Sequence, residues 1–498
     1  MELKKEGKQK RISDLWYFCI LGAILAVMFV FGQELEWNYR EFIIGFVIVI
    51  GLFTVLGIEL WKNIELYKFA FLFIIVVGSL SLLIQPILNL PDENVHFARA
   101  ELVSRGKIIM DTKQVEYETI QSVLDLKDNV RKSYVSSSVK GKEIDYSAIK
   151  VEHVAASNNS FLYFPQAIGI LIAKSLHLDV IWMLWLARFM NLLCYAFIIG
   201  YAVKITPKLQ FPLFFLAVFP MCIQQAASCN PDAIINSSAI LLVAYFLYLY
   251  ESAEETITWK QMGIYLGLSI IVTLSKITNI FMAGLILLVP LGKYSHKKSA
   301  VFMKCMVIGS VIGIGGAYYF YTTLFSANSD SLQYTQENYV NSSEQIYYIL
   351  TNFKEWFRNF GFALIWNAES YIMHLGRFGW MDYGNPLIPM FTMTMFGKIC
   401  VQEQGVRINR GNKVLISMMI LGIYCAVCLA LYLAWTPVGS DTILGVQGRY
   451  FIPMCALVIL LFASSEKDMS IGRTYTGDMI AMLGMNGAML IATALRYY

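Results

Sequence analysis

The chain has 498 residues, of which 57% are hydrophobic and only 15% are charged, and its formal net charge is +4. A soluble globular domain carries about 25% charged residues, so this composition excludes an ordinary soluble protein and predicts a polytopic membrane protein. The sequence contains no basic segment interleaved with aromatic residues, which excludes nucleic acid as an expected partner and leaves the lipid bilayer.

Apolar runs along the whole chain predict an all-α fold with about 13 membrane spans. A full crossing needs about 20 apolar residues, and several of these runs are shorter. The first run follows a basic segment, Met1 to Arg11, and no small-residue cleavage site follows it, so we interpret it as an uncleaved anchor. The expected spans are 15–32, 42–60, 69–89, 180–203, 211–228, 233–250, 262–275, 277–291, 300–324, 386–400, 414–436, 449–465 and 477–496.

Lysine and arginine in the short loops predict the orientation, because they accumulate on the cytoplasmic side. The basic N-terminus is then cytoplasmic, and later basic loops share that side only if residues 262–291 cross twice, with Lys276 at the outer turn. In the alternative, 262–291 is one long span with Lys276 inside the membrane, and 161–176 is a crossing. That alternative places Lys204 and Lys208 outside, against the rule. Lys276 is a functional candidate in either case, or a lysine that extends to the interface.

Four regions are expected along the chain. Residues 91–179 and 325–385 are the large polar segments and are expected to build an extracytoplasmic helical cap. Within the first segment, 111–150 is expected to be helical and 161–176 to lie as a helix along the membrane interface. The regions are 1–68 (tail and two accessory helices), 69–324 (transmembrane core with the first outer loop), 325–385 (aromatic-rich outer loop) and 386–498 (last transmembrane helices).

Residues 90–100 follow an apolar run long enough to cross a bilayer and combine an acid, an imidazole and a guanidinium. Pro91 suits the first turn of a helix, because its ring fixes φ and its missing N–H would be unpaired there. Such a helix places Asp92, His96 and Arg99 on one face, at i, i+4 and i+7. Acids are favoured in any first helical turn, so a purely structural interpretation of Asp92 stays open.

On the preferred topology, the polar side chains that apolar packing does not explain fall on the outer side. Acids come from the first two outer regions and cations from several later ones, which suits an anionic, membrane-held donor and a neutral hydroxyl acceptor. A carboxylate can take the hydroxyl proton as general base, while lysine and arginine hold the leaving phosphate. The acids can also bind a divalent cation, and the sequence leaves metal use open. The residues are Asp92, Glu93, His96, Arg99, Asp232, Lys276, Arg377, Asp382 and Arg449.

Five motifs together resemble a family of bacterial polytopic membrane proteins long catalogued as a domain of unknown function. That family is similar to the GT-C superfamily of membrane glycosyltransferases, and the resemblance covers roughly residues 69–465. This chain departs from the best-known members by two additional early spans and by lacking a large soluble C-terminal domain. The motifs are Pro91-Asp92-Glu93…His96-Phe97…Arg99-Ala100, Gln447-Gly448-Arg449-Tyr450-Phe451-Ile452-Pro453, Tyr163-Phe164-Pro165, Asn230-Pro231-Asp232 and Gly379-Trp380…Asp382.

The resemblance implies a GT-C-like fold and transfer of a sugar from a polyprenyl-phosphate donor, at the outer face of the plasma membrane. The expected acceptor is a hydroxyl of a cell-envelope glycan. Asp92 would be the base of an inverting reaction, and Glu93 beside it stays open as the nucleophile of a retaining one. Asp232 is the second-loop acid, and Mg²⁺ or Mn²⁺, if used, would bind Asp92 and Asp232.

Further residues are expected to hold the donor or the acceptor. Lys276, Arg449 and Arg99 are the candidates for the donor phosphate. Trp380 or Tyr163 is a candidate for stacking on a sugar ring, and Asp382 is equally well explained as a turn former. The candidates for substrate contact are His96, Tyr163, Asn230, Trp380, Asp382, Gln447 and Tyr450.

Two other classes of protein stay open. A lipid-linked sugar flippase or transporter would place charged residues near the bilayer midplane and often carries inverted repeats, and no internal repeat is visible in this sequence. In a non-enzymatic envelope assembly protein, the acids would be solvated helix caps.

Overall fold

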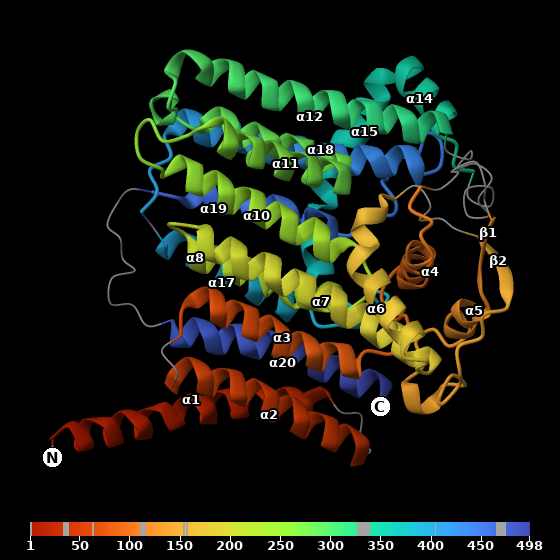
Figure 1. The fold of residues 1–498 in the computed structure, drawn as a ribbon, viewed down its shortest axis with the longest axis vertical. Helices are drawn as coiled ribbons and strands as arrows, with labels where there is room; N and C mark the ends of the chain where they lie inside the picture. The colour runs from red at the N-terminus through yellow and green to blue at the C-terminus, as the bar shows by residue number, and fades with distance from the viewer. Residues whose placement is uncertain are drawn as a thin grey trace.

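The computed structural model describes residues 2–32, 39–61, 64–109, 116–152, 155, 158–325, 339–403, 405–464 and 475–498. Long helices lie side by side, and smaller elements gather at one end of them (Figure 1). We call this end, which carries the described residues of 86–179 and 339–386, the cap end. Among the described residues, the strands form only two two-stranded sheets. The prediction of an all-α membrane protein is confirmed.

Seven helices in the described part of the chain are long and apolar enough to cross a membrane. They are α2 (Tyr39–Trp61), α3 (Leu66–Ile84), α7 (Val180–Ile205), α10 (Asp232–Tyr250), α12 (Lys297–Phe325), α18 (Arg410–Ala434) and α20 (Thr476–Tyr497). The remaining predicted ranges hold α1 (Glu2–Gly32), α8 (Gln210–Ala217), α9 (Pro220–Ala226), α11 (Trp259–Ser275), η4 (Ile277–Leu288), α17 (Leu387–Gln402) and α19 (Ile452–Phe462). The total of about 13 crossings therefore stays a prediction.

The predicted span 211–228 is not one continuous helix, because α8 and α9 are separated by a break, and its crossing of the membrane stays a prediction. Phe219 is extended, with φ −50° and ψ 140°. Pro220 is the cause, since its ring disfavours helical geometry at the preceding residue and it has no N–H to donate. The side chain of Asn486 in α20 donates to the carbonyl of Val218 at 2.9 Å, which satisfies a backbone group at the break.

Residues 259–288 reverse direction at Lys276, which confirms the predicted turn. The Tyr265 hydroxyl donates to the carbonyl of Ala283 at 3.1 Å, and Ile257 forms a β-bridge with Tyr294. The arms differ in type: α11 has 17 α-helical residues and η4 has 12 in a 3₁₀ helix. At about 1.5 Å and 2.0 Å per residue, both arms span about 25 Å, so they match in length.

The predicted helix over 111–150 is wrong for most of its length. β1 (Glu116–Ile120) pairs antiparallel with β2 (Ala148–Glu152), with Glu116 opposite Glu152. Only α5 (Gln121–Lys127) and a 3₁₀ turn at Tyr134–Ser136 are helical there, and residues 110–115 lie outside the described residues. Residues of β1 alternate between exposed and buried from Glu116 to Thr119, a two-residue period that is typical of a strand with one covered face.

The other cap elements are helical. α4 (Glu93–Ser104) follows Asp92, and α6 (Phe164–Ser175) begins with Pro165 in its first turn, so the helix predicted at 161–176 is confirmed. Its position along a membrane interface stays a prediction. The second cap region holds α14 (Ser342–Thr351), α15 (Phe353–Trp366), α16 (Ala368–Met373) and a small hairpin of β3 (Arg377–Phe378) and β4 (Tyr383–Gly384).

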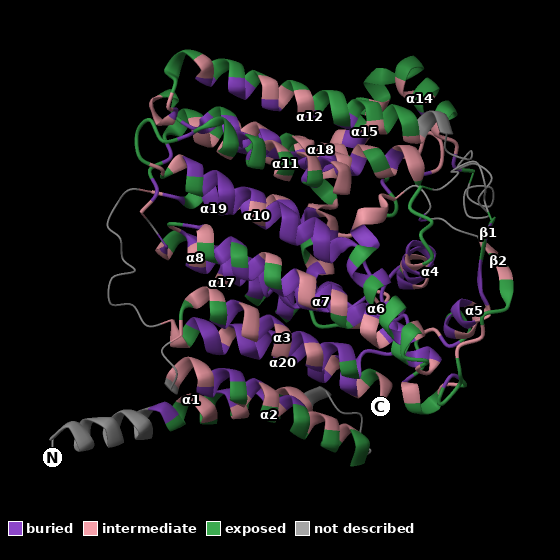
Figure 2. Ribbon diagram, in the orientation of Figure 1, coloured by how far each residue is buried: buried purple, intermediate pink, exposed green. Residues whose placement is uncertain are grey.

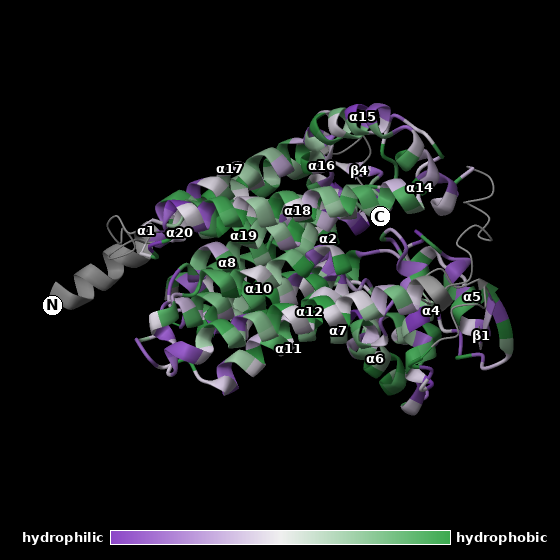
Figure 3. Cartoon of the chain, turned by 90° about the horizontal axis from the view of Figure 1, so that it is seen from above, coloured by the Kyte–Doolittle hydropathy of each residue, from purple (hydrophilic) through white to green (hydrophobic). Residues whose placement is uncertain are grey.

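Burial separates a central layer of helices from peripheral ones (Figure 2). In the most apolar windows of α10 and α20, 83% of the residues are buried, compared with 28% in α2 and α18. Exposed apolar side chains on the peripheral helices are the surface that lipid would cover. α20 packs against α1, α2 and α3, so the two ends of the chain build one side of the bundle (Figure 1). Seen from above, hydrophilic residues concentrate near the ends of the helices (Figure 3).

Candidate functional site

Four segments that are distant in sequence meet at the cap end, beside the start of α4. Arg449, in the 3₁₀ turn η8 (Gly448–Phe451), lies with Nη1 3.0 Å from Asp232 and with Nη2 3.5 Å from Asp92. Lys276, at the tip of the α11–η4 hairpin, interacts electrostatically with Asp232 and Arg449. We call Asp92, Asp232, Lys276 and Arg449 the charge cluster. All four were selected from the sequence.

Arg449 is the centre of the cluster and is held on three sides. Its side chain is only 5% exposed, and Nε donates to the Gln447 side-chain oxygen at 2.7 Å. The preceding Gly448 packs so closely on α16 that a Cβ there would lie 2.0 Å from the carbonyl oxygen of Tyr371. A glycine at 448 therefore sets the approach of η8 and the position of the guanidinium.

Asp92 supplies the accessible carboxylate of the cluster. Its backbone is left-handed, with φ 63° and ψ 8°, a conformation uncommon for residues other than glycine. The Asp92 carbonyl accepts from the N–H groups of Val95 and His96 at 3.0 Å, so α4 starts at this turn. The Asp92 side chain is 52% exposed, and its contact with Arg449 is loose, which leaves acceptor sites on the carboxylate open.

Glu93 points away from the charge cluster into the protein. It is fully buried and forms a bidentate pair with Arg188 of α7, at 2.8 Å to Nε and 2.9 Å to Nη2. The Glu93 carboxylate also accepts from the backbone N–H groups of Cys229 at 3.0 Å and Leu90 at 3.4 Å. Four donors occupy its two oxygens, so in this geometry the Glu93 carboxylate is engaged inside the protein and does not reach the charge cluster.

Arg188 was not selected from the sequence, although a signal was available. An arginine inside an otherwise apolar run is costly in a membrane and requires a partner. Besides Glu93, its guanidinium donates to the carbonyls of Gln85 at 3.1 Å and Pro86 at 2.7 Å. Arg188 thereby ties the loop before Asp92 to α7.

The turn before Asp232 is fixed by amide side chains. Asn191 of α7 donates to the carbonyls of Ser228 at 2.7 Å and Asn230 at 3.1 Å. Asn230 donates to the carbonyl of Pro91 at 3.4 Å and accepts from the Asp232 N–H at 3.2 Å. Asn230 is buried and joins the two acidic turns to each other, and its predicted contact with substrate stays a prediction.

Lys276 lies on the ring of Tyr450, with Nζ 3.5 Å from the ring centroid. The Asn159 side chain donates to the carbonyl of Leu274 at 2.6 Å and so anchors the hairpin tip to the first cap region. Lys276 lies in the turn between α11 and η4, where loss of hydration lowers the pKa of its ammonium group to about 7, although Asp232 opposes this shift and Arg449 adds to it. Its charge is therefore poised near neutral pH.

Arg99, Tyr163 and His96 form a group in the first cap region, in which Arg99 and Tyr163 are buried and His96 is half-buried. The Arg99 guanidinium is buried and donates to the backbone carbonyls of Lys107 at 2.9 Å and Ile108 at 3.0 Å, so the structure does not bring it to the predicted phosphate position. Tyr163 is fully buried, and its hydroxyl lies 2.8 Å from His96 Nδ1. Burial leaves Tyr163 no face for a sugar ring, so we replace that prediction with a supporting role for the His96–Tyr163 pair.

Trp380 and Asp382 form a second polar group on the β3–β4 hairpin. The Trp380 indole N–H donates to the carbonyl of Leu88 at 3.3 Å, and the Arg131 guanidinium lies 5.1 Å from its ring. Asp382 lies 4.0 Å from Arg131 and 3.5 Å from Arg496. A narrow crevice connects this hairpin with the charge cluster, and its lining includes Pro91, Arg377, Gly379, Met381, Gln447 and Arg449.

The cluster fits a guanidinium better than a metal ion. Arg449 contacts both acids that were predicted as metal ligands, Asp92 and Asp232, and so takes the place that a shared cation would occupy. Within the described part of the chain, no three His, Cys, Asp or Glu side chains are grouped to hold a metal. We therefore assign no chemical step to Mg²⁺ or Mn²⁺.

Fold and site together define an α-helical membrane protein that gathers two acids and two cations at one end of its helices. The family described as "Predicted membrane protein (DUF2142)" matches residues 73–458, and the chain belongs to this family. The comparisons with curated proteins and with solved structures give no match.

Proposed function

We propose that this protein is a membrane glycosyltransferase that transfers a sugar from a polyprenyl-phosphate donor to a hydroxyl of a cell-envelope glycan. The observation that carries the proposal is Asp92, an exposed carboxylate 3.5 Å from Arg449 at one end of the helices, in a cluster that also holds Lys276 near Arg449 and Asp232. A GT-C-like fold is part of the proposal.

The reaction that suits this geometry is a single displacement at the anomeric carbon. Asp92 takes the proton of the acceptor hydroxyl, whose oxygen forms the new bond to the anomeric carbon as the bond from that carbon to the phosphate oxygen breaks. Polyprenyl phosphate leaves with the electron pair of the broken bond, and Arg449 and Lys276 stabilise its charge. One base and one displacement invert the anomeric configuration.

The donor itself would prepare the base. Arg449 contacts Asp92 at 3.5 Å and Asp232 at 3.0 Å, so Asp92 is its looser partner. A phosphate that binds the Nη2 side of Arg449 would compete with Asp92 and free its carboxylate for the acceptor proton. Asp232 would keep the guanidinium in place during this exchange.

The distribution of basic residues supports an extracytoplasmic position for the cap end. Lysines and arginines of the short connections lie at the opposite ends of the helices, where the positive-inside rule places the cytoplasm. They include Lys204, Lys208, Lys293, Lys297, Lys298, Arg407, Arg410 and Lys413. The location in the plasma membrane is part of the same proposal.

Sugar transfer by the purified protein tests the proposal. The protein would be reconstituted in liposomes with polyprenyl-phosphate monosaccharides labelled in the sugar, and crude envelope glycan would be the acceptor. We expect label to pass to the glycan from one donor, with release of polyprenyl phosphate. Movement of intact labelled lipid across the liposome membrane without transfer would instead support the flippase class, although the four residues of the charge cluster lie at the helix ends and not midway along them.

Gly448→Ala is expected to lower transfer without removing any charged group. Its Cβ would meet the Tyr371 carbonyl, so η8 must shift and carry Arg449 with it. A displacement near 1 Å costs about 100-fold in rate. The measurement is the transfer rate of Gly448→Ala beside that of a control variant, Gly477→Ala. A Cβ at residue 477 would meet no atom within 4 Å, so the control should keep its activity. Equal loss in both variants would contradict the role of Gly448.

Donor affinity is expected to fall as the pH rises above about 7, because the pKa of Lys276 lies there and only its protonated form attracts the phosphate. The loss is at most about tenfold per pH unit and levels off, because Arg449 stays charged and still attracts the phosphate. Lys276→Arg should stay positively charged across this pH range, because a guanidinium stays protonated. The donor affinity of this variant should therefore not fall as the pH rises. The measurement is KM for the donor across the neutral to alkaline range. The same slope in both proteins would rule out Lys276 as its origin.

Transfer is expected to be insensitive to EDTA, because Arg449 lies between the two carboxylates that a metal would need. The rate would be measured before and after chelation, and again with added Mg²⁺ or Mn²⁺. Loss on chelation with recovery on adding one metal would show that Arg449 gives way to a cation during turnover.

A further inference from the structure

Helix α15 carries apolar side chains on both of its faces. Its inner face packs on α18, where the rings of Phe360 and Tyr432 lie 5.7 Å apart. Its outer face exposes Phe362, Ile365 and Trp366, with exposed fractions of 63%, 81% and 73%. The run from Phe360 to Trp366 contains no charged or polar residue. A helical segment that is apolar all round is expected inside a protein core or in lipid, and the outer face of this one is not covered by protein among the described residues.

A hydrogen bond to α18 shows how deep the end of α15 lies. α18 carries no charged residue from Val414 to Ala434, a stretch of about 31 Å at 1.5 Å per residue, which matches a hydrocarbon core of about 30 Å. The hydroxyl of Tyr424, midway along this stretch, donates to the carbonyl of Leu364 at 2.6 Å. The end of α15 therefore lies beside the apolar part of α18 and well inside the end of that helix.

The preceding helix, α14, lies at the end of α18 itself. The Ser342 hydroxyl donates to the carbonyl of Leu433 at 2.9 Å, and the Gln345 side chain accepts from the N–H of Gly439 at 2.9 Å. The last charged residue of α15 is Arg358, in the first half of the helix. From α14 to the end of α15 the chain therefore runs inward along α18, and its charged side chains stop before the apolar run begins.

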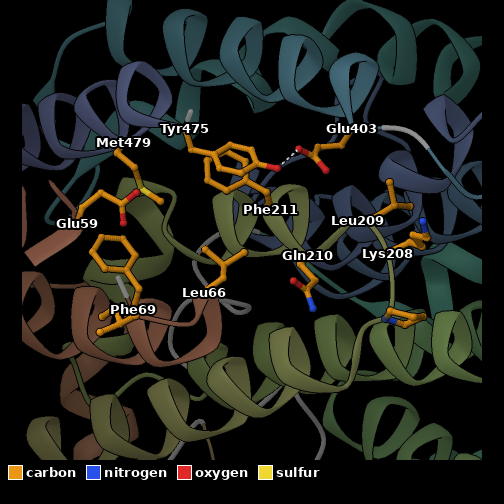
Figure 4. Close-up of a pocket in the computed structure, with 12 residues that line it drawn as sticks. Glu59, Leu66, Phe69, Lys208, Leu209, Gln210, Phe211, Glu403, Tyr475 and Met479 are labelled. Atoms are coloured by element: carbon orange, nitrogen blue, oxygen red, sulfur yellow. Dashed lines mark hydrogen bonds between the residues drawn. The ribbon is translucent and has the colours of Figure 1, made fainter. Parts of the chain in front are cut away.

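Charged side chains also mark the other boundary of the apolar layer. At the ends of the helices opposite the cap end, Glu59, Lys208 and Glu403 line a cavity of about 360 Å³ (Figure 4). A short connection leads from Glu403 to Arg410, the first residue of α18, so α18 begins at this boundary. The apolar part of α18 thus lies between two polar layers, and the end of α15 lies beside it.

The backbone at the end of α15 is suited to a layer without water. Carbonyls in the last turn of a helix lack partners within the helix, and an unpaired carbonyl is costly in lipid. The N–H of Asn367 donates to the carbonyls of Ala363 and Ile365, and the carbonyl of Leu364 accepts from Tyr424. Protein groups therefore satisfy these three carbonyls.

We propose that the second half of α15, Phe360–Trp366, is inserted into the bilayer leaflet on the side of the cap end. Its exposed face contacts acyl chains there, as the apolar face of an interfacial helix does. α15 and the apolar helix α17 lie on the same side of the molecule (Figure 3), and the start of α17 exposes Leu387 and Phe391. The lipid-contacting surface thus continues from α17 onto the cap. This proposal does not depend on sugar transfer.

Thiol labelling of the full chain in liposomes tests the proposal. Glu344→Cys, in α14, and Ile365→Cys, in α15, change exposed side chains. The double variant carries both changes on one side of the membrane, so its orientation in the liposome affects both equally. A charged maleimide that does not cross membranes would be added, and peptide mass spectrometry would separate the two sites from the native cysteines.

We expect position 365 to react at least about tenfold more slowly than position 344, because acyl chains exclude the charged reagent and disfavour the reactive thiolate. After denaturation in sodium dodecyl sulfate, both positions should react alike, which controls for intrinsic reactivity. Equal rates in intact liposomes would overturn the proposal. Thermal unfolding of the double variant should match that of the wild type, because neither side chain lies in a packed face.

A photoreactive lipid distinguishes acyl chains from a protein partner. Wild-type protein would be irradiated in liposomes that contain phosphatidylcholine with a diazirine midway along one acyl chain, and the adducts would be mapped by mass spectrometry. We expect adducts within Phe360–Trp366 and none on α14. Slow labelling at position 365 without lipid adducts would mean that a protein surface, such as a second copy of this chain, covers α15, and it would overturn the proposal.

Discussion

Asp92→Asn should lower the rate of sugar transfer about 100- to 10,000-fold, the usual contribution of a general base. Asparagine keeps the shape of the side chain but cannot accept the proton of the acceptor hydroxyl. The protein should stay folded, because the Asp92 side chain is half-exposed and its contact with Arg449 is loose. The measurement is kcat for transfer, with KM for the donor determined in the same assay.

The direction of the KM change makes this experiment more specific. Asp92 competes with the donor phosphate for Arg449 in the proposed exchange, so its neutral replacement should bind the donor at least as well as the wild type. A fall in kcat with an unchanged or lower KM is therefore expected. Asp128→Asn, at an exposed position after α5, is the matched control and should retain full activity. Undiminished kcat in Asp92→Asn would remove Asp92 from the chemistry and direct attention to Asp232.

The adjacent acids at 92 and 93 show how far the sequence alone reaches. Their position after an apolar run identified the segment where the charge cluster forms. Asp92, Asp232 and Arg449 of that cluster lie in the motifs, and Lys276 was selected from its place at the predicted turn. Local spacing could not separate the two acids, because the difference depends on the left-handed turn at Asp92 and on Arg188, 95 positions away from Glu93. The same limit applies to Arg99 and Tyr163, whose partners come from packing rather than from helical periodicity.

The fold shows a similar division. The length of the apolar runs located the long apolar helices, and the charge of the loops located the reversal at Lys276. Both signals follow from local composition. The break at Phe219 had a visible cause in Pro220, but the surrounding apolar run concealed it. Strand β1 carried its two-residue period in only five residues, and its partner lies about 30 positions further on, so the charged composition of the region dominated the prediction.

Glu93→Gln should destabilise the protein rather than only slow a reaction. Glu93 and Arg188 are both fully buried, and the carboxylate serves four donors. Removing one charge of a buried pair leaves the other uncompensated, which costs about 3–5 kcal/mol in the free energy of unfolding. Thermal unfolding in detergent and the folded yield from size-exclusion chromatography are the measurements. A folded Glu93→Gln protein without activity would contradict this and restore Glu93 as a catalytic carboxylate.

The double variant Glu93→Gln, Arg188→Gln tests whether the cost comes from the pair. It removes both charges while retaining amide groups that can donate and accept hydrogen bonds. We expect its stability to exceed the value predicted from the sum of the two single variants, with a coupling of about 0.5–3 kcal/mol. Additive losses would mean that the two residues act independently. The coupling matters for function because the Glu93 carboxylate holds the backbone N–H groups of Leu90 and Cys229. These residues shortly precede Asp92 and Asp232, the two acids that contact Arg449.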